Sequence, residues 1–273
     1  TSDASPSSGF DIISYRLVPY ENGVKKDEIT GTLPVSNGVA NLGIPAGFKG
    51  QIYVESFDNA GNHSGQVTPQ SFVIDQDTPV INILMNNTTS YTDANGNKLF
   101  ITDMSVTATI TDTSSGIKEI GYSQSSEKAG FARKSIVLAN TGYHVGDSLG
   151  DGWVVAAMDT NLVTKVTKTF TYTTDDNDTL LTLDATDRSG NKIARADSAK
   201  FTIDKTTPII NVSFREDNDT DVYYEANRIA DITVIERNFS ASLIKTAIEN
   251  KFGDIPGITF TKISDSEYKA VIE

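Results

Sequence analysis

The sequence predicts an all-β protein built from tandem sandwich modules, and two observations support this prediction. The first is an internal repeat, because the segment from Asp58 to Ile83 returns as the segment from Asp187 to Val212, with ten of twenty-six positions identical. Average composition would give roughly one or two identities by chance. The second is the alternation of apolar and polar residues in short runs between turn residues, which is typical of half-buried strands. The repeated positions belong to turns and strands, so the repeated unit is a structural module.

The spacing of the repeat predicts the domain organisation. One constant spacing separates the members of the pairs Asp58 and Asp187, Asp75 and Asp204, and Pro79 and Pro208. We expect three modules: residues 1–77, which lack their first strands, residues 78–206, which are complete, and residues 207–273, which are truncated before their last strand. An earlier motif, Ser8-Gly9, matches Ser115-Gly116 at a shorter spacing. The difference between the two spacings places an insertion in the second module, near residues 123–164.

The expected strands follow the repeat in chain order. They cover residues 52–57 and 72–74 in the first module, 81–83, 106–111 and 181–185 in the second, and 210–212 and 230–235 in the third. Each run places apolar side chains at every second position, which buries one face of a strand. The third module departs from this pattern, because Ser240 precedes apolar residues at helical spacing and Gly253 follows them. This predicts one short capped helix in that module.

Composition and charge exclude several classes of function. The formal net charge of −13 makes nucleic acids and anionic membrane surfaces poor partners, since like charges repel. No apolar run approaches the roughly twenty residues that a membrane helix needs, so we expect no membrane insertion. The chain has no cysteine, which fits an extracellular repeat protein without disulfides and equally a reduced cytosolic protein. Neither end reads as a secretion or wall-sorting signal, and we therefore expect a piece of a longer protein.

Four motifs carry a resemblance to a known family. They are Asp112-x-x-Ser115-Gly116-Ile117, Asp58-Asn59-Ala60-Gly61-Asn62, Phe72-Val73-Ile74-Asp75 with Thr78-Pro79, and Glu236-Arg237-Asn238-Phe239. With these motifs the chain resembles the bacterial immunoglobulin-like repeats of large surface proteins in Gram-positive bacteria. The resemblance implies tandem immunoglobulin-like β-sandwiches in a rod, within a protein that is secreted or attached to the bacterial cell surface. It brings no catalytic residue to this chain.

Acidic residues near the repeated turn and the Pro79 junction form a candidate metal site. Asp58, Asp75 and Asp77 offer carboxylate oxygens of the kind that Ca²⁺ prefers, and Asp187 with Asn191 offers the same groups in the second copy of the turn. The alternative is structural, because an Asp or Asn before Gly commonly closes a turn by bonding its own backbone. The sequence thus requires no cofactor and leaves Ca²⁺ binding as an open alternative.

The insertion is the candidate for an interaction surface. It holds Phe131, Tyr143 and Trp153, which is the single Trp of the chain. Aromatic side chains of this kind anchor protein interfaces and stack on sugar rings. The alternative is that the added residues form another hairpin whose aromatic side chains complete the core of the module itself.

The sequence favours a structural and adhesive role over catalysis. The two histidines, His63 and His144, come without the spacing of a catalytic triad, so we expect no enzyme. We expect a monomeric stalk or adhesin, stiffened at its Thr-Pro junctions because Pro fixes φ and restricts the preceding residue. The first alternative is a module that binds a host glycan or a host protein such as an immunoglobulin. The second alternative is an accessory region of an extracellular glycoside hydrolase.

Overall fold

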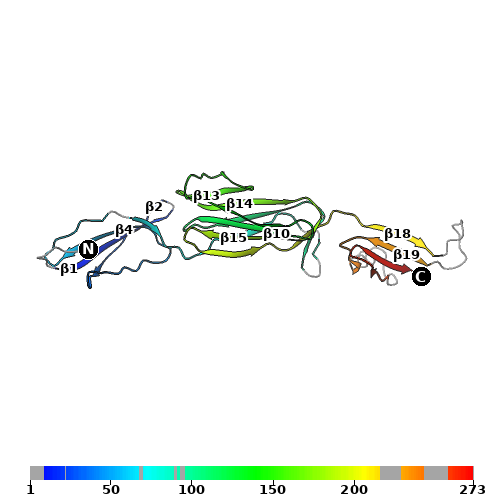
Figure 1. Cartoon of the computed structure of the whole chain (residues 1–273), viewed down its shortest axis with the longest axis horizontal. Coiled ribbons are helices and arrows are strands. Elements are labelled where there is room, and N and C mark those ends of the chain that lie inside the picture. Colours follow the sequence, from blue (N-terminus) through cyan, green and yellow to red (C-terminus); the bar gives the residue numbers. More distant parts are fainter. Residues whose placement is uncertain are drawn as a thin grey trace. The chain divides into compact units, whose positions relative to one another are not determined.

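The computed structural model is built from β-strands, which confirms the predicted all-β class (Figure 1). It describes residues 9–21, 23–67, 70–88, 91–92, 96–215, 229–242 and 258–272. The chain divides into two compact units, Thr1–Ile203 and Asp204–Glu273. The first unit therefore contains the first and second predicted modules, and the second unit begins close to the predicted start of the third. Among the described residues, no helix is long and apolar enough to cross a membrane.

The first part of the first unit holds a single antiparallel sheet in the order β2-β1-β4-β5, with β3 also paired to β1. Its strands are β1 (Phe10–Glu21), β2 (Val24–Lys25), β3 (Ile29–Pro34), β4 (Lys49–Asp58) and β5 (Gln70–Val73). Tyr15 of β1 lies opposite Val54 of β4 and Gly31 of β3. A Cβ atom at position 31 would lie 2.6 Å from the Tyr15 hydroxyl, so the close approach of this ring requires glycine. β4 and β5 confirm the strands predicted near residues 52–57 and 72–74.

The remainder of the first unit, from residue 80 to residue 203, forms two sheets around one hydrophobic core. The first, which we call the β9 sheet, has the order β12-β13-β14-β9-β6 and consists of β6 (Val80–Met85), β9 (Met104–Thr111), β12 (Ser148–Gly150), β13 (Trp153–Asp159) and β14 (Leu162–Tyr172). Two sheets with apolar inner faces are the arrangement of a β-sandwich.

The second sheet of this sandwich, which we call the β10 sheet, has the order β11-β10-β15-β17-β8-β7, with β16 paired to β15. Its strands are β7 (Tyr91–Thr92), β8 (Lys98–Phe100), β10 (Ile117–Ser125), β11 (Phe131–Val137), β15 (Asp176–Asp187), β16 (Lys192–Asp197) and β17 (Phe201–Ile203). β17 pairs with β8 in parallel, whereas the remaining described pairs of this sheet are antiparallel.

The sandwich core follows directly from the alternation in the sequence. Along β9 the side chains of Val106, Ala108 and Ile110 are fully buried, and the residues between them are partly exposed. Full burial of a Val or Ile side chain contributes about 1.5–3 kcal/mol. The Tyr122 ring lies at the centre of an aromatic group, with centroid distances of 5.9 Å to Trp153 and 5.8 Å to Phe170. The strands predicted at residues 81–83, 106–111 and 181–185 are confirmed by β6, β9 and β15.

The segment near residues 123–164 contains both a strand shared with the first sheet and further strands. β11 has a counterpart in the first sheet, since it pairs with β10 as β3 pairs with β1. The hairpin of β12 and β13 extends the edge of the β9 sheet, since β13 pairs with both β12 and β14. This is the additional hairpin that the core alternative predicts.

The second unit contains one described sheet in the order β18-β19-β21-β20. Its strands are β18 (Ile209–Phe214), β19 (Ala230–Ile235), β20 (Thr261–Lys262) and β21 (Glu267–Ile272). They confirm the strands predicted at residues 210–212 and 230–235. Of the predicted helix, Ala241 and Ser242 are helical, and the remainder lies outside the described residues.

Candidate functional site

The repeated Asp turn is closed by the carboxylate of its first residue at both of its occurrences. Asp187 Oδ1 accepts hydrogen bonds from the backbone N–H groups of Gly190 and Asn191, at 2.7 and 2.8 Å. Asp58 Oδ1 accepts the N–H groups of Ala60 and Asn62, at 2.9 and 2.8 Å. In each turn the Asn side chain donates to the other carboxylate oxygen, at 2.8 Å. The turn-closing role proposed for these residues is therefore present in the structure.

Three carboxylates meet where the segment between the first two predicted modules contacts the sandwich. One oxygen each from Asp75, Asp112 and Asp187 lies within 4.8 Å of the others. Asp187 is completely buried, Asp112 is 5% exposed and Asp75 is partly buried. Asp75 follows β5, Asp112 follows β9 and Asp187 ends β15, so the two sheets of the sandwich and the connecting segment each contribute one acid. We call this group the junction triad.

Hydrogen bonds attach Asp75 firmly to the sandwich. Its Oδ2 atom accepts the backbone N–H of Ser115 at 3.2 Å and the Ser115 hydroxyl at 2.5 Å. Its main-chain oxygen accepts the side-chain amide of Asn191 at 3.1 Å. The backbone N–H of Asp77 donates to Asp75 Oδ1 at 3.1 Å. The connecting segment is thus held at side chain and backbone by two different loops of the sandwich.

Burial and like charge shape the titration of Asp112 within the junction triad. Burial raises the pKa of Asp112 above its ordinary value, and the charges of Asp75 and Asp187 raise it further. The N–H groups of Gly116 and Ser115, which donate to Asp112 Oδ1 at 2.7 and 3.0 Å, oppose that rise. The ionised triad concentrates negative charge in a poorly solvated position, which is costly without compensation.

The chemistry of the junction triad is that of clustered hard oxygen donors. Such a group can coordinate a divalent cation such as Ca²⁺. It contains Asp75 from the predicted metal residues but neither Asp58 nor Asp77. Asp58 closes its own turn, and the exposed Asp77 contacts Asp75 through its backbone N–H. The structure therefore brings Asp75 together with Asp187, which the sequence also offered as an oxygen ligand, and with Asp112, which it did not.

The second unit repeats part of this arrangement. Asp204 is the repeat counterpart of Asp75, and Glu236 follows β19 as Asp112 follows β9. Asn238 donates its side-chain amide to Asp204, and its backbone N–H donates to Glu236 Oε1 at 2.9 Å. Burial raises the pKa of Glu236, and the charge of Asp204 adds to this effect. The juxtaposition of acids is thus a property of the repeat, since it occurs before both the second and the third predicted module.

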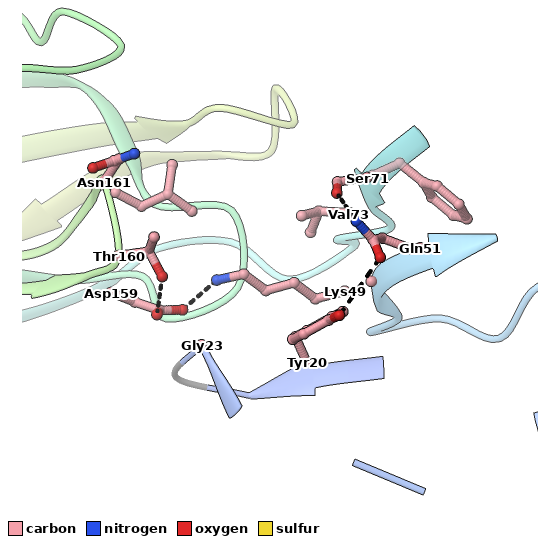
Figure 2. Close-up of a pocket in the computed structure, with 12 residues that line it drawn as sticks. Tyr20, Gly23, Lys49, Gln51, Ser71, Val73, Asp159, Thr160 and Asn161 are labelled. Atoms are coloured by element: carbon pink, nitrogen blue, oxygen red, sulfur yellow. Dashed lines mark hydrogen bonds and ion pairs between the residues drawn. The ribbon is translucent and has the colours of Figure 1, made fainter. Parts of the chain in front are cut away.

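A cleft of about 500 Å³ also lies within the first unit, between the first sheet and the loop that follows β13 (Figure 2). Lys49 extends from β4 across this cleft and pairs with Asp159 at the end of β13. On its other side Gln51 accepts a hydrogen bond from the Tyr20 hydroxyl at 3.5 Å and donates to Ser71 at 3.3 Å. The lining of the cleft is mostly apolar and includes Phe72, Val73 and Leu162, and the Lys49–Asp159 ion pair crosses it.

The aromatic side chains of the insertion belong to the sandwich core. Trp153 is 0% exposed, and its ring packs against Tyr122 and Phe170. Phe131 and Tyr143 are partly buried and pack against the same core. The Tyr143 hydroxyl also accepts the backbone N–H of Ala139 at 3.2 Å. These positions correspond to the core alternative, since a ligand surface requires accessible rings.

The comparisons with known proteins add no family to this description. A scan against protein-family models finds no match to the chain, and a search of the curated proteins finds none either. The acid of the junction triad that sequence reasoning did not assign is Asp112. The sequence did contain a signal for Asp112, because this residue begins a turn motif in the module that starts just after Asp75. Asp187 could be recognised as the repeat counterpart of Asp58.

Proposed function

We propose that this chain is a non-catalytic spacer and adhesive region of a bacterial surface protein, built from immunoglobulin-like modules. The observation that carries the proposal is the attachment of Asp75 to the sandwich through Ser115 and Asn191. A repeat protein that spans a distance or transmits force needs connections of defined geometry. A connecting segment anchored at both its side chain and its backbone provides such a connection.

Two further features support a stiff connection between the first two modules. Pro79 follows the anchored residue by four positions, and its ring fixes its own φ and restricts Thr78. Lys49 of the first sheet pairs with Asp159 of the sandwich, and these side chains are only 24% and 9% exposed. An ion pair with this degree of burial is screened less by solvent than a surface pair.

The surroundings of the two histidines support a non-catalytic role. His63 contacts Glu55 at 2.5 Å and His144 contacts Asp147 at 3.5 Å, and the two imidazole side chains are 59% and 85% exposed. Solvated pairs of this kind lack the protected, oriented environment in which general-base histidines work. No comparable observation supports the alternative of an accessory region of a glycoside hydrolase or that of a ligand-binding module. The aromatic residues that a binding surface would need pack in or against the core instead.

The experiment that tests the proposal measures the rigidity of the first connection. Because the chain has no cysteine, the exposed Thr32 and Lys165 can be replaced by Cys and spin-labelled without competing sites. Pulsed electron paramagnetic resonance should give a narrow distance distribution between these labels in the otherwise unchanged chain. Asp75→Ala should broaden it, whereas the matched control Asp77→Ala should not, since only the backbone of Asp77 contacts Asp75. A distribution already broad before any further change would contradict the proposal.

The adhesive part of the proposal has its own test. A glycan array and an immunoglobulin pull-down, both with the full chain, should yield at least one ligand if the region contacts a host. Empty results in both would reduce the proposal to its spacer function.

A further inference from the structure

Tension that passes through the middle module, residues 80–203, runs along its strands. The chain enters the module beside Asp75, one carboxylate oxygen of which lies within 4.8 Å of Asp187 at the end of β15. It leaves the module after Ile203, which pairs with Asp176 at the beginning of β15. The points of entry and exit therefore lie at opposite ends of one strand, which spans about 40 Å at the rise of an antiparallel strand.

β17, the strand through which the chain leaves, has neighbours on both sides. It pairs antiparallel with β15 and in parallel with β8, each of whose three residues lies opposite a residue of β17. The backbone N–H of Lys98 donates to the main-chain oxygen of Lys200 at 3.4 Å, which extends the contact beyond the strand. The last strand of the module is thus an inner strand of the β10 sheet.

The side chains of β17 are buried in the sandwich. Phe201, Thr202 and Ile203 are 0%, 7% and 2% exposed. The Phe201 ring packs edge-on against Phe100 of β8 and Tyr172 of β14, at centroid distances of 6.3 and 5.0 Å. Sliding β17 along its axis would pull these side chains out of a closely packed core, and closely packed interiors resist such displacement.

The direction of the load decides how strongly the pairing of β17 resists. Tension along the strands pulls β17 in shear past β8 and β15, so the hydrogen bonds to both neighbours are strained together and have to break together. Tension across the strands opens the same pairing from one end, one bond after another. A single hydrogen bond contributes little net stability, so the pairing resists well only when its bonds share the load.

We propose that the middle module bears tension along its strands, and that the pairing of β17 with β8 and β15 resists this tension at the exit end. At the entry end β6 is loaded in shear as well, since its six residues pair antiparallel with β9. This role rests on the proposed spacer function, because only a spacer under load requires it. Opening under tension is governed by the rate at which a terminal strand slips out, and equilibrium stability does not set it directly.

Force spectroscopy with two pairs of anchors tests the resistance of β17. Because the chain has no cysteine, handles can be attached after Thr207→Cys combined with either Ser189→Cys or Thr174→Cys, all at exposed positions. Ser189 follows the far end of β15 and Thr174 precedes its near end. The Ser189 pair therefore pulls β17 along its neighbours, and the Thr174 pair pulls it away from them. Detaching β17 should need a several-fold higher force with the Ser189 pair.

The two anchor pairs provide a matched comparison, because both leave β6 and the first module outside the load. Urea unfolding of the two doubly substituted chains should give the same midpoint, so that only the direction of the force differs. Equal forces for the two pairs would overturn the inference, because the bonds of β17 would then not share the load.

A third pair, Asp77→Cys with Thr207→Cys, loads the whole module through β6 and β17. The Asp77 side chain is exposed, and only its backbone N–H contacts Asp75. This pair should withstand more force than the Thr174 pair and release about 400 Å of chain in one step, given the span of an extended residue. Opening at the low force of the Thr174 pair would overturn the tension-bearing role. The spacer function would survive that result, since the distance distribution between spin labels reports the stiffness of the connection and is independent of β17.

Discussion

The middle module and the second unit contain matching strands with very different burial. Ile81 and Ile210 are the same residue at equivalent positions, paired with Ile110 and Val234 respectively. Ile81 packs against a closed core, whereas Ile210 is 60% exposed. The strand pattern is preserved and the burial of this side chain is not, although its partner Val234 on the same face is only 2% exposed. Alternation therefore specifies which face is apolar and not how far each side chain on that face is covered.

The largest effect on stability is expected at the centre of the covered core. Trp153→Ala removes a completely buried ring that contacts Tyr122 and Phe170, and truncation of a buried aromatic residue costs about 3–5 kcal/mol. Urea unfolding followed by circular dichroism measures the change. Trp153→Phe should cost less, because it keeps a ring and removes an indole N–H that has no hydrogen-bond partner in the described structure. An unchanged midpoint for Trp153→Ala would show that the ring does not support the core.

An intermediate effect on stability is expected when the same substitution is made at two equivalent positions, one in the middle module and one in the second unit. Ile81→Ala should lower the free energy of unfolding by about 1–2 kcal/mol, somewhat below the range for fully buried aliphatic residues, because Ile81 is partly buried. Ile210→Ala should change it by less than about 0.5 kcal/mol, as is usual for exposed positions. Urea unfolding followed by circular dichroism measures both changes. Equal losses would mean that the two faces are equally covered in the isolated chain.

The smallest effect concerns the junction triad and depends on pH. The pKa of Asp112 is raised in the folded state above its ordinary value of 3.8, so the folded chain binds the proton more tightly than the unfolded chain. Stability from this group is then present at low pH and is lost as the pH rises from about 3.8 through the raised pKa. Melting at several pH values in the presence of a chelator should show this loss.

Asp112→Asn provides the control for that pH dependence. Asparagine keeps the oxygen that accepts the N–H groups of Ser115 and Gly116 and removes the charge beside Asp75 and Asp187. The variant should melt higher than the unchanged chain at neutral pH and lose this part of the pH dependence. If the variant melts lower in the chelator, the charge of Asp112 is stabilising and the electrostatic description of the triad is wrong.

Much of the β-structure was predictable because its cause is local. The runs around Val106 and Ile232 alternate with period two, and both proved to be strands. The hydrogen bonds of the Asp58 and Asp187 turns also connect residues only a few positions apart. The repeat spacing alone predicts the insertion near residues 123–164. The role of Trp153 could not be decided from the sequence, because an aromatic residue in an inserted hairpin can either pack in the core or form part of a binding surface.

The junction triad lay beyond sequence reasoning for a related reason. Asp75 and Asp187 are far apart in the chain, and nothing in the local pattern of either residue indicates the other. Their proximity arises because β9 and β15 belong to different sheets of one sandwich, whose ends meet the segment that carries Asp75.

The sequence by itself determined the strands, their apolar faces, the repeated turns and the order of equivalent elements along the chain, since all of these follow from backbone conformation and short-range periodicity. Only the tertiary structure decided which apolar faces are covered, which carboxylates approach one another and where the aromatic residues of the insertion lie. These properties depend on which sheets stack, and stacking joins residues whose separation along the chain leaves no periodic signal.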